Sequence, residues 1–258
     1  SFSDRGIYTD LLRKFYEEGH YVYAVCPVER REKKKTEVRK EKQGTILNVQ
    51  TLNLQKTNIV EKGFGTLAIE YQFLAAIKKH FADVKFDVII YSTPPITFSK
   101  VINFVKKRDN AYSYLLLKDI FPQNAVDMKM LKENGILHKM FVKKEQKLYT
   151  ISDTIGCMSE ANKKFILHHN PTISPEKVEI NPNTIEPFIF NQSSEQKQAI
   201  KVKYNLPIDK KIFVYGGNLG KPQGLDFLLE TIVATTNEAV FFLIVGSGTE
   251  YNKIEKWF

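Results

Sequence analysis

Short apolar runs alternate along the chain with longer segments in which apolar residues recur at helical spacing. The runs predict strands at residues 21–26, 46–52, 87–91, 111–117, 154–158 and 177–180. Between them, one helical face is marked by Phe64, Leu67, Ala68, Tyr71, Leu74 and Ala75, on a helix ending near Phe81. Further helices are predicted over 7–18, around 102–105 and around 141–149. Strands that are apolar throughout, each followed by a helix, indicate an α/β fold with a parallel sheet covered on both faces.

A stretch of turn and loop formers interrupts this alternation. Residues 182–198 hold Pro182, Asn183, Pro187, Asn191, Ser193 and Ser194, so we expect a loop there. The alternation then restarts, with strands predicted at 211–215 and 239–245 and helices at 223–236 and from 251 onward. We therefore predict a first domain over 1–183 and a second domain that begins at 184.

Both ends suggest that each domain is only partly present. A doubly wound domain normally opens with a strand, whereas this chain opens with a polar loop and a helix. Residues 184–258 are few for an independent α/β core, because a domain of that size buries little surface. We expect a first strand before Ser1 and further elements after Phe258.

Composition and charge narrow the class of partner. The chain has 43% hydrophobic and 26% charged residues, which is ordinary for a globular protein, and a net charge of +9. That charge favours nucleic acid, phospholipid head groups or phosphorylated small molecules. Residues 29–42 hold eight basic and four acidic residues. We interpret this segment as a solvated, mobile loop; the alternative is a patch that touches an anionic membrane surface.

The cysteines and the lengths of the apolar runs indicate a reducing compartment and a chain that does not span a membrane. Cys26 and Cys157 lie in apolar runs and are expected to be free, buried thiols. No apolar run reaches the length of a membrane span, and residues 1–10 lack the apolar core of a signal peptide. We expect a cytoplasmic location, with peripheral contact at the inner face of the membrane as an option.

The most informative motif is a glycine-rich turn between the strand at 211–215 and the next helix. We expect Gly216, Gly217 and Gly220 to adopt positive φ and to let the backbone approach a ligand closely. Gly224 lies near the start of the helix, whose free N–H groups attract an anion, and Lys221 adds a positive charge beside it. The turn could cradle a diphosphate, or it could be a tight β–α turn without a ligand.

A second glycine turn, Gly246-Ser247-Gly248, follows the strand at 239–245. It resembles a dinucleotide fingerprint, but Tyr251 stands where the third glycine should be. It also comes late in its domain rather than at the first β–α turn, so nicotinamide binding is not expected.

In the first domain, two polar segments follow strands: Tyr91–Ile96 and Leu117–Gln123. Open α/β sheets bind ligands at the carboxyl ends of their strands. Asp119 could therefore act as a base or accept a sugar hydroxyl, or it could simply cap a loop. The five histidines are scattered, and with two distant cysteines no zinc spacing appears, so no metal is expected.

The order and spacing of these segments resemble those of the retaining glycosyltransferases of family four, which have the GT-B fold. The donor half is matched by 217–226 and 242–248, the segments near the domain junction by 159–162 and 179–183, and the first loop and helix by 6–22. Asp119-Ile-Phe-Pro122 is similar to the Asp-Leu-Trp-Pro of a bacterial subgroup that includes fucosaminyltransferases of capsule and O-antigen synthesis.

The resemblance implies two Rossmann-like domains with parallel sheets that face a cleft, the first for the acceptor and the second for a nucleotide sugar, and we expect this donor to be UDP-linked. It places Gly217, Asn218, Lys221, Gln223 and Gly224 at the donor diphosphate. Gly246, Ser247 and Gly248 would lie at the nucleotide, and Arg5 and Gly6 at an acceptor or phosphate loop. No metal or cofactor is implied, because positive side chains and a helix N-terminus would offset the charge of the leaving diphosphate.

Two departures from the family pattern weaken the positive charge. Asn218 and Gln223 stand where the family usually has arginine and lysine, so Lys221 would replace only part of it. The glutamate pair expected near the sugar and ribose would lie beyond Phe258, and we therefore expect residues 1–258 alone to be inactive or nearly so.

Other functions stay open at this point. A nucleotide-sugar 2-epimerase shares the fold and would act without an acceptor. A basic protein that binds nucleic acid is disfavoured, because the basic residues are interleaved with glutamate and no RNA-binding or helix-turn-helix signature appears. A basic membrane-surface protein or a non-catalytic scaffold is a further alternative.

Overall fold

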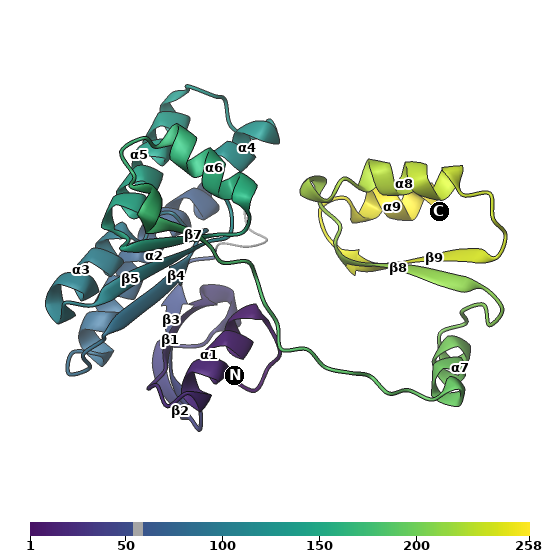
Figure 1. Ribbon diagram of the computed structural model, residues 1–258, viewed down its shortest axis with the longest axis horizontal. Helices are drawn as coiled ribbons and strands as arrows, with labels where there is room; N and C mark the ends of the chain where they lie inside the picture. Colours follow the sequence, from purple (N-terminus) through teal and green to yellow (C-terminus); the bar gives the residue numbers. More distant parts are fainter. Residues whose placement is uncertain (54–58) are drawn as a thin grey trace. The chain divides into compact units, whose positions relative to one another are not determined.

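The computed structural model describes residues 1–53 and 59–258, with backbone only for 59–64, and divides them into two units, Ser1–Glu186 and Pro187–Phe258 (Figure 1). The expected boundary at 183/184 lies close to this division. Phe64, which was assigned to a helical face, lies outside the described side chains.

The larger unit contains two sheets. One has the order β1-β3-β2, from β1 (Tyr23–Glu29), β3 (Gly44–Thr51) and β2 (Glu37–Glu41). The other is entirely parallel in the order β4-β5-β6-β7, from β4 (Val88–Ser92), β5 (Tyr112–Leu117), β6 (Thr154–Cys157) and β7 (Val178–Ile180). The α-helices described in the larger unit are α1 (Ile7–Glu17), α2 (Ile59–His80), α3 (Ser99–Asp109), α4 (Gln123–Asp127), α5 (Ile136–Ile151) and α6 (Glu160–His169). The α/β class and the parallel strands are as predicted.

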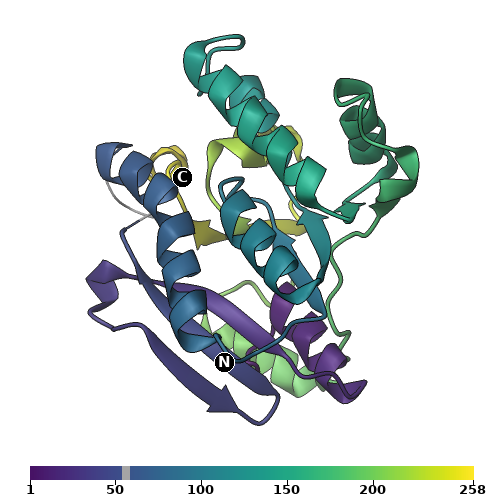
Figure 2. The same ribbon diagram turned by 90° about the vertical axis from the view of Figure 1, so that its left-hand side faces the viewer.

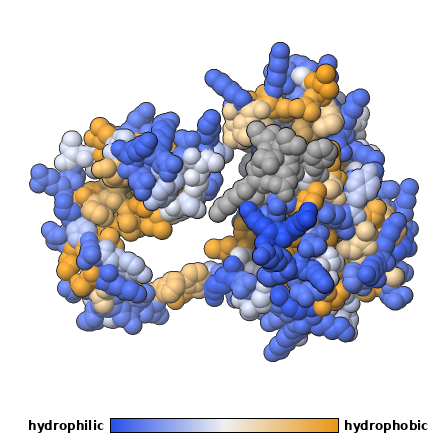
Figure 3. Space-filling model, turned by 180° about the vertical axis from the view of Figure 1, so that it is seen from behind, coloured by the Kyte–Doolittle hydropathy of each residue, from blue (hydrophilic) through white to orange (hydrophobic). Residues whose placement is uncertain are grey.

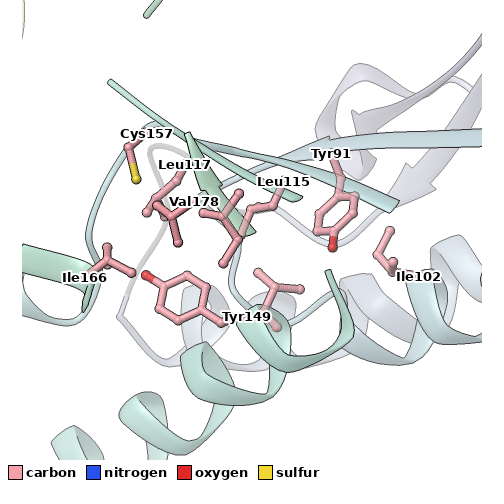
Figure 4. Packing of buried hydrophobic residues seen from close by; sticks show 10 residues of the cluster. Tyr91, Ile102, Leu115, Leu117, Tyr149, Cys157, Ile166 and Val178 are labelled. Carbon is pink, nitrogen blue, oxygen red and sulfur yellow. The ribbon is translucent and has the colours of Figure 1, made fainter. Parts of the chain in front are cut away.

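Two apolar clusters hold this unit together. In the first, Leu115, Leu117 and Val178 point from the sheet toward Tyr149 on α5 (Figure 4). In the second, α2 and α3 pack over β3 through residues such as Leu47, Phe73 and Val105. Cys157 is buried and Cys26 half-buried, and both are free thiols, as expected.

The charged segment 29–42 differs from its prediction. It is solvent-exposed, but it contains the short 3-10 helix Arg30–Glu32 and the strand β2 rather than a mobile loop. β2 pairs antiparallel with β3, so this sheet is mixed. An edge strand needs no apolar alternation when its side chains face solvent, and charged residues there discourage pairing with other chains.

The smaller unit is built on a parallel pair, β8 (Lys211–Asn218) and β9 (Val240–Ser247). Helices α8 (Leu225–Ala234) and α9 (Tyr251–Trp257) cover one face of the pair, with Leu219, Leu225, Leu229 and Ile254 buried between them (Figure 1). The expected loop over 182–198 ends early, because α7 (Ser194–Lys203) begins inside it. Ser193 caps this helix and exchanges hydrogen bonds with Gln196. Ser193 and Ser194, which the sequence predicts to be in a loop, therefore begin a helix.

Candidate functional site

The first glycine turn is an extension of strand β8. The predicted strand end at Tyr215 is wrong: pairing with β9 continues through Gly216, Gly217 and Asn218. The expected positive φ is also wrong for Gly216, Gly217 and Gly220; of the three, none is in the left-handed region. Their role is therefore not to bend the chain, because an extended strand passes through the first two.

The backbone at this strand end is open to a ligand. A Cβ built on Gly216 would meet no heavy atom within 4 Å, and one on Gly217 would lie 3.8 Å from the Tyr215 hydroxyl oxygen. Gly216, Gly217 and Asn218 are all exposed, whereas Leu219 and Gly220 are buried. The turn is thus anchored below and uncovered at its rim.

The next helix presents its N-terminus beside this rim. A 3-10 turn, Lys221–Gln223, leads to Gly224, whose φ of 62° favours glycine, and α8 starts immediately after it. Among the residues that the structure describes, no side chain caps α8, so its first amides remain available to an anion. Lys221 and Gln223 are exposed, and within the described residues the Lys221 ammonium has no partner.

One negative charge opposes this arrangement. Asp226 lies in the first turn of α8, but its carboxylate is paired with the Lys253 ammonium at 2.5 Å. The pair leaves Lys221 as the unpaired charge beside the helix start.

The second glycine turn is required by packing. A Cβ on Gly246 would lie 2.0 Å from the Gly217 carbonyl oxygen, and one on Gly248 would lie 2.2 Å from that of Leu219. The Leu219 amide donates to the Ser247 carbonyl at 2.9 Å, and the Glu250 amide donates to the Leu219 carbonyl at 2.8 Å. The structure therefore brings the two predicted glycine turns side by side, and the glycines of the second need no ligand to explain them.

In the larger unit, Arg5 and Gly6 lie just before α1, where a network that the sequence did not reveal holds the loop. The Asp10 carboxylate accepts the Gly6 amide at 3.2 Å and the Glu186 amide at 3.0 Å, and it pairs with Arg13. These two backbone N–H groups, first that of Glu186, and the guanidinium lower the pKa of Asp10. Arg13 also donates to the Phe2 and Asp4 carbonyls, at 2.7 and 2.8 Å.

Asp119 is exposed at the carboxyl end of β5. Its position is fixed through the backbone: the buried Thr93 hydroxyl donates to the Asp119 carbonyl at 3.0 Å, and the Thr93 amide donates to Leu116 at 3.2 Å. Within the described part of the chain its carboxylate makes no hydrogen bond or ion pair, so this carboxylate does not cap the loop. Sequence reasoning passed over the adjacent Lys118, which is half-buried and likewise unpartnered there; burial lowers the pKa of its ammonium.

No set of three or more potential metal ligands gathers anywhere among the described residues. No protein-family model matches the chain.

Two curated proteins resemble parts of the sequence. It is 25% identical over 202 residues to the "Probable glycosyltransferase WbjE" of Pseudomonas aeruginosa, which covers 74% of this chain and 47% of that protein. It is 33% identical over 85 residues to the "Putative colanic acid biosynthesis glycosyl transferase WcaI" of Escherichia coli (strain K12), covering 33% of this chain and 21% of that protein. The chain thus spans less than half the length of either relative.

The sucrose-phosphate synthase of Thermosynechococcus elongatus has a similar structure. The TM-score is 0.70 at 17% sequence identity, and the match covers 97% of this chain and 60% of that one. The fold of the chain is therefore the GT-B fold of glycosyltransferases, of which it spans part.

Proposed function

We propose that the protein to which this chain belongs transfers a sugar from a nucleotide diphosphate sugar to an acceptor hydroxyl. The observation that carries the proposal is the open end of β8, where exposed glycine backbone, the uncapped N-terminus of α8 and the unpaired Lys221 ammonium converge. Donor N–H groups and a single cation suit a diphosphate, which carries its charge on several oxygens. The names of the two relatives agree with this activity.

In this mechanism the bond between the anomeric carbon and the diphosphate oxygen breaks, and a new bond forms to the acceptor oxygen. Lys221 and the first amides of α8 stabilise the negative charge that develops on the leaving diphosphate, so no bound metal is needed. In the larger unit, the exposed Asp119 carboxylate receives the proton of the acceptor hydroxyl. Gly246, Ser247 and Gly248 would border the nucleotide, and Arg5 and Gly6 would border the acceptor or its phosphate.

The proposed substrates follow the family resemblance. They are an amino sugar carried by UDP and an acceptor that is a saccharide or a lipid-linked oligosaccharide at the cytoplasmic face of the membrane. The retaining outcome belongs to the same resemblance. Support comes from the Asp119-Ile-Phe-Pro122 segment and from the colanic acid biosynthesis in the name of WcaI.

Calorimetric titration of the full-length protein with UDP and UDP-sugars tests the donor site. Replacing Lys221 by alanine should weaken binding by about 1–2 kcal/mol, or about 5- to 30-fold in Kd, the scale of one charged hydrogen bond. Lys211→Ala is the matched control, because Lys211 is also exposed but lies at the opposite end of β8. Equal affinities of the two variants would remove Lys221 from the site. Absence of binding to any UDP-sugar at millimolar concentration would reject the proposed function.

A further inference from the structure

The turn between α4 and α5 exposes large apolar side chains. Met130 is 70% exposed, Ile136 is 90% exposed and Leu137 is 57% exposed, while Met140 follows one helical turn later at 36%. We call these four residues, with Lys129, Lys132, Lys139 and Lys143, the turn patch. The connection stands at the outer end of its unit in two perpendicular views (Figures 1 and 2).

The exposure is built into the backbone. The Met130 and Leu131 amides both donate to the Ala125 carbonyl, at 2.8 and 3.1 Å, and the Lys139 amide donates to the Gly135 carbonyl at 3.0 Å. The turn is therefore a defined structure that holds its apolar side chains outward. Hydrophobic residues stand beside strongly hydrophilic ones at this end of the unit (Figure 3).

Exposed lysines surround the apolar residues. Between 129 and 143 the lysines of the patch are all exposed, and Glu133 is the exposed acidic residue. On α5 the exposed stripe runs Ile136, Lys139, Met140, Lys143, which alternates apolar and basic side chains at helical spacing. Apolar side chains among lysines are the combination that binds the head-group region of an anionic bilayer.

Two other surfaces lack one half of this combination. The segment 29–42 has basic residues, but several are paired with glutamate, as in Arg31–Glu29 at 2.6 Å and Arg39–Glu41 at 3.0 Å, and its exposed large apolar residue is Val38. The segment 185–190 exposes Ile185, Phe188, Ile189 and Phe190, yet it carries no basic residue.

The patch lies on the same side of the sheet as Asp119. α5 connects the parallel strands β5 and β6, so its first turn is at the carboxyl ends of the strands. The rings of Phe121 and Phe141 are 5.0 Å apart, which sets the second turn of α5 against the segment that follows Asp119.

We propose that the turn patch is a membrane-contact surface, which binds a leaflet containing anionic phospholipids through its lysines and inserts Met130, Ile136, Leu137 and Met140 among the head groups. No described helix is both long and apolar enough to span a bilayer, so contact would be peripheral. Membrane contact here would bring a lipid-linked acceptor to the Asp119 loop. That last link rests on the proposed function, whereas the contact itself does not.

Co-sedimentation with vesicles, without any sugar donor, tests the surface. The chain should bind vesicles of phosphatidylcholine with phosphatidylglycerol far more strongly than phosphatidylcholine alone. The variant K132Q/K139Q/K143Q should lower the partition coefficient by about a hundredfold, at about fivefold per lysine. Its charge-matched control is K34Q/K35Q/K40Q in the segment 29–42, which should bind almost like the parent chain.

The apolar half is tested by I136S/L137S, which should lower partitioning to both vesicle types. Ile189→Ser is the control, because Ile189 is 87% exposed outside the patch. All substitutions are at exposed positions, and circular dichroism checks that each variant is folded. Failure to bind anionic vesicles, or equal losses in patch and control variants, would overturn the proposal. Titration with UDP-sugars on the same preparations separates this outcome from failure of the donor site.

Discussion

A substitution at Gly246 tests the reason for the second glycine turn. Alanine there places a Cβ 2.0 Å from the Gly217 carbonyl oxygen, well inside any van der Waals contact, and the obstacle is backbone rather than a flexible side chain. β8 and β9 must separate at their carboxyl ends, where Gly217 and Gly246 are register partners. Overpacking of this kind destabilises by about 1–3 kcal/mol.

The control is Gly216→Ala, one residue away from the obstacle on the neighbouring strand. Its Cβ would meet nothing within 4 Å and its φ is not in the left-handed region, so the stability should change by less than about 0.5 kcal/mol. Both variants keep the charge of the turn.

Urea unfolding followed by tryptophan fluorescence measures the difference. The chain has one tryptophan, Trp257, in α9, and this helix buries Ile254 against Leu219 and Leu225. The signal therefore reports on the smaller unit. If Gly246→Ala unfolds at the same urea concentration as Gly216→Ala, the packing explanation is refuted, and the glycine would have to be explained by a ligand.

Three further outcomes are expected. Burial raises the pKa of Glu145 to about 7, so between pH 4.5 and 7 the folded chain holds a proton that the unfolded chain releases. The free energy of unfolding should therefore fall by up to about 3 kcal/mol as the pH rises through this range. Urea unfolding measures this fall, and the Glu145→Gln variant should show a flat profile. Folding lowers the pKa of Asp10, so the ionised carboxylate stabilises the folded chain at pH values above the unfolded pKa, and this contribution is lost as the pH falls. The Tm of the Arg13→Met variant should therefore depend less on acid pH than the Tm of the parent. In the full-length protein, Asp119→Asn should lower kcat for UDP release by about 100-fold or more while the Kd for the UDP-sugar stays unchanged; an unaltered kcat would remove Asp119 from proton transfer.

The strands were predictable because burial on both faces leaves little choice of residue. Leu115, Leu117 and Ile155 are fully buried or nearly so, and runs of such residues mark the parallel sheet directly. The same reasoning predicted polar segments after the strands, which is why Asp119 was singled out as a candidate. Strand lengths were less certain, since glycines that look like a turn can continue a paired strand, as Gly216 and Gly217 do.

Elements without a buried face were missed. β2 and α7 have almost wholly exposed side chains, so neither has an apolar period to detect. For α7 the capping box of Ser193 and Gln196 was the available signal, and it outweighs the general preference of serine for loops. The Asp10–Arg13 pair has the spacing of an ordinary surface pair on a helix; its hydrogen bonds to Gly6 and Glu186 depend on long-range packing that no local pattern encodes.

In the proposed donor site, the start of α8 would supply positive charge that neutral side chains do not. Asn218 and Gln223 are neutral, but the start of α8 supplies about half an elementary charge through amides that no described side chain occupies. Asp226 would cancel this contribution if it were free, and the 2.5 Å pair with Lys253 prevents that. The local balance is thus one lysine plus a helix N-terminus, kept positive by an ion pair from α9. The proposed diphosphate would be held by few charges and would need its remaining hydrogen bonds from backbone, and exposed glycine backbone is what β8 presents at this point.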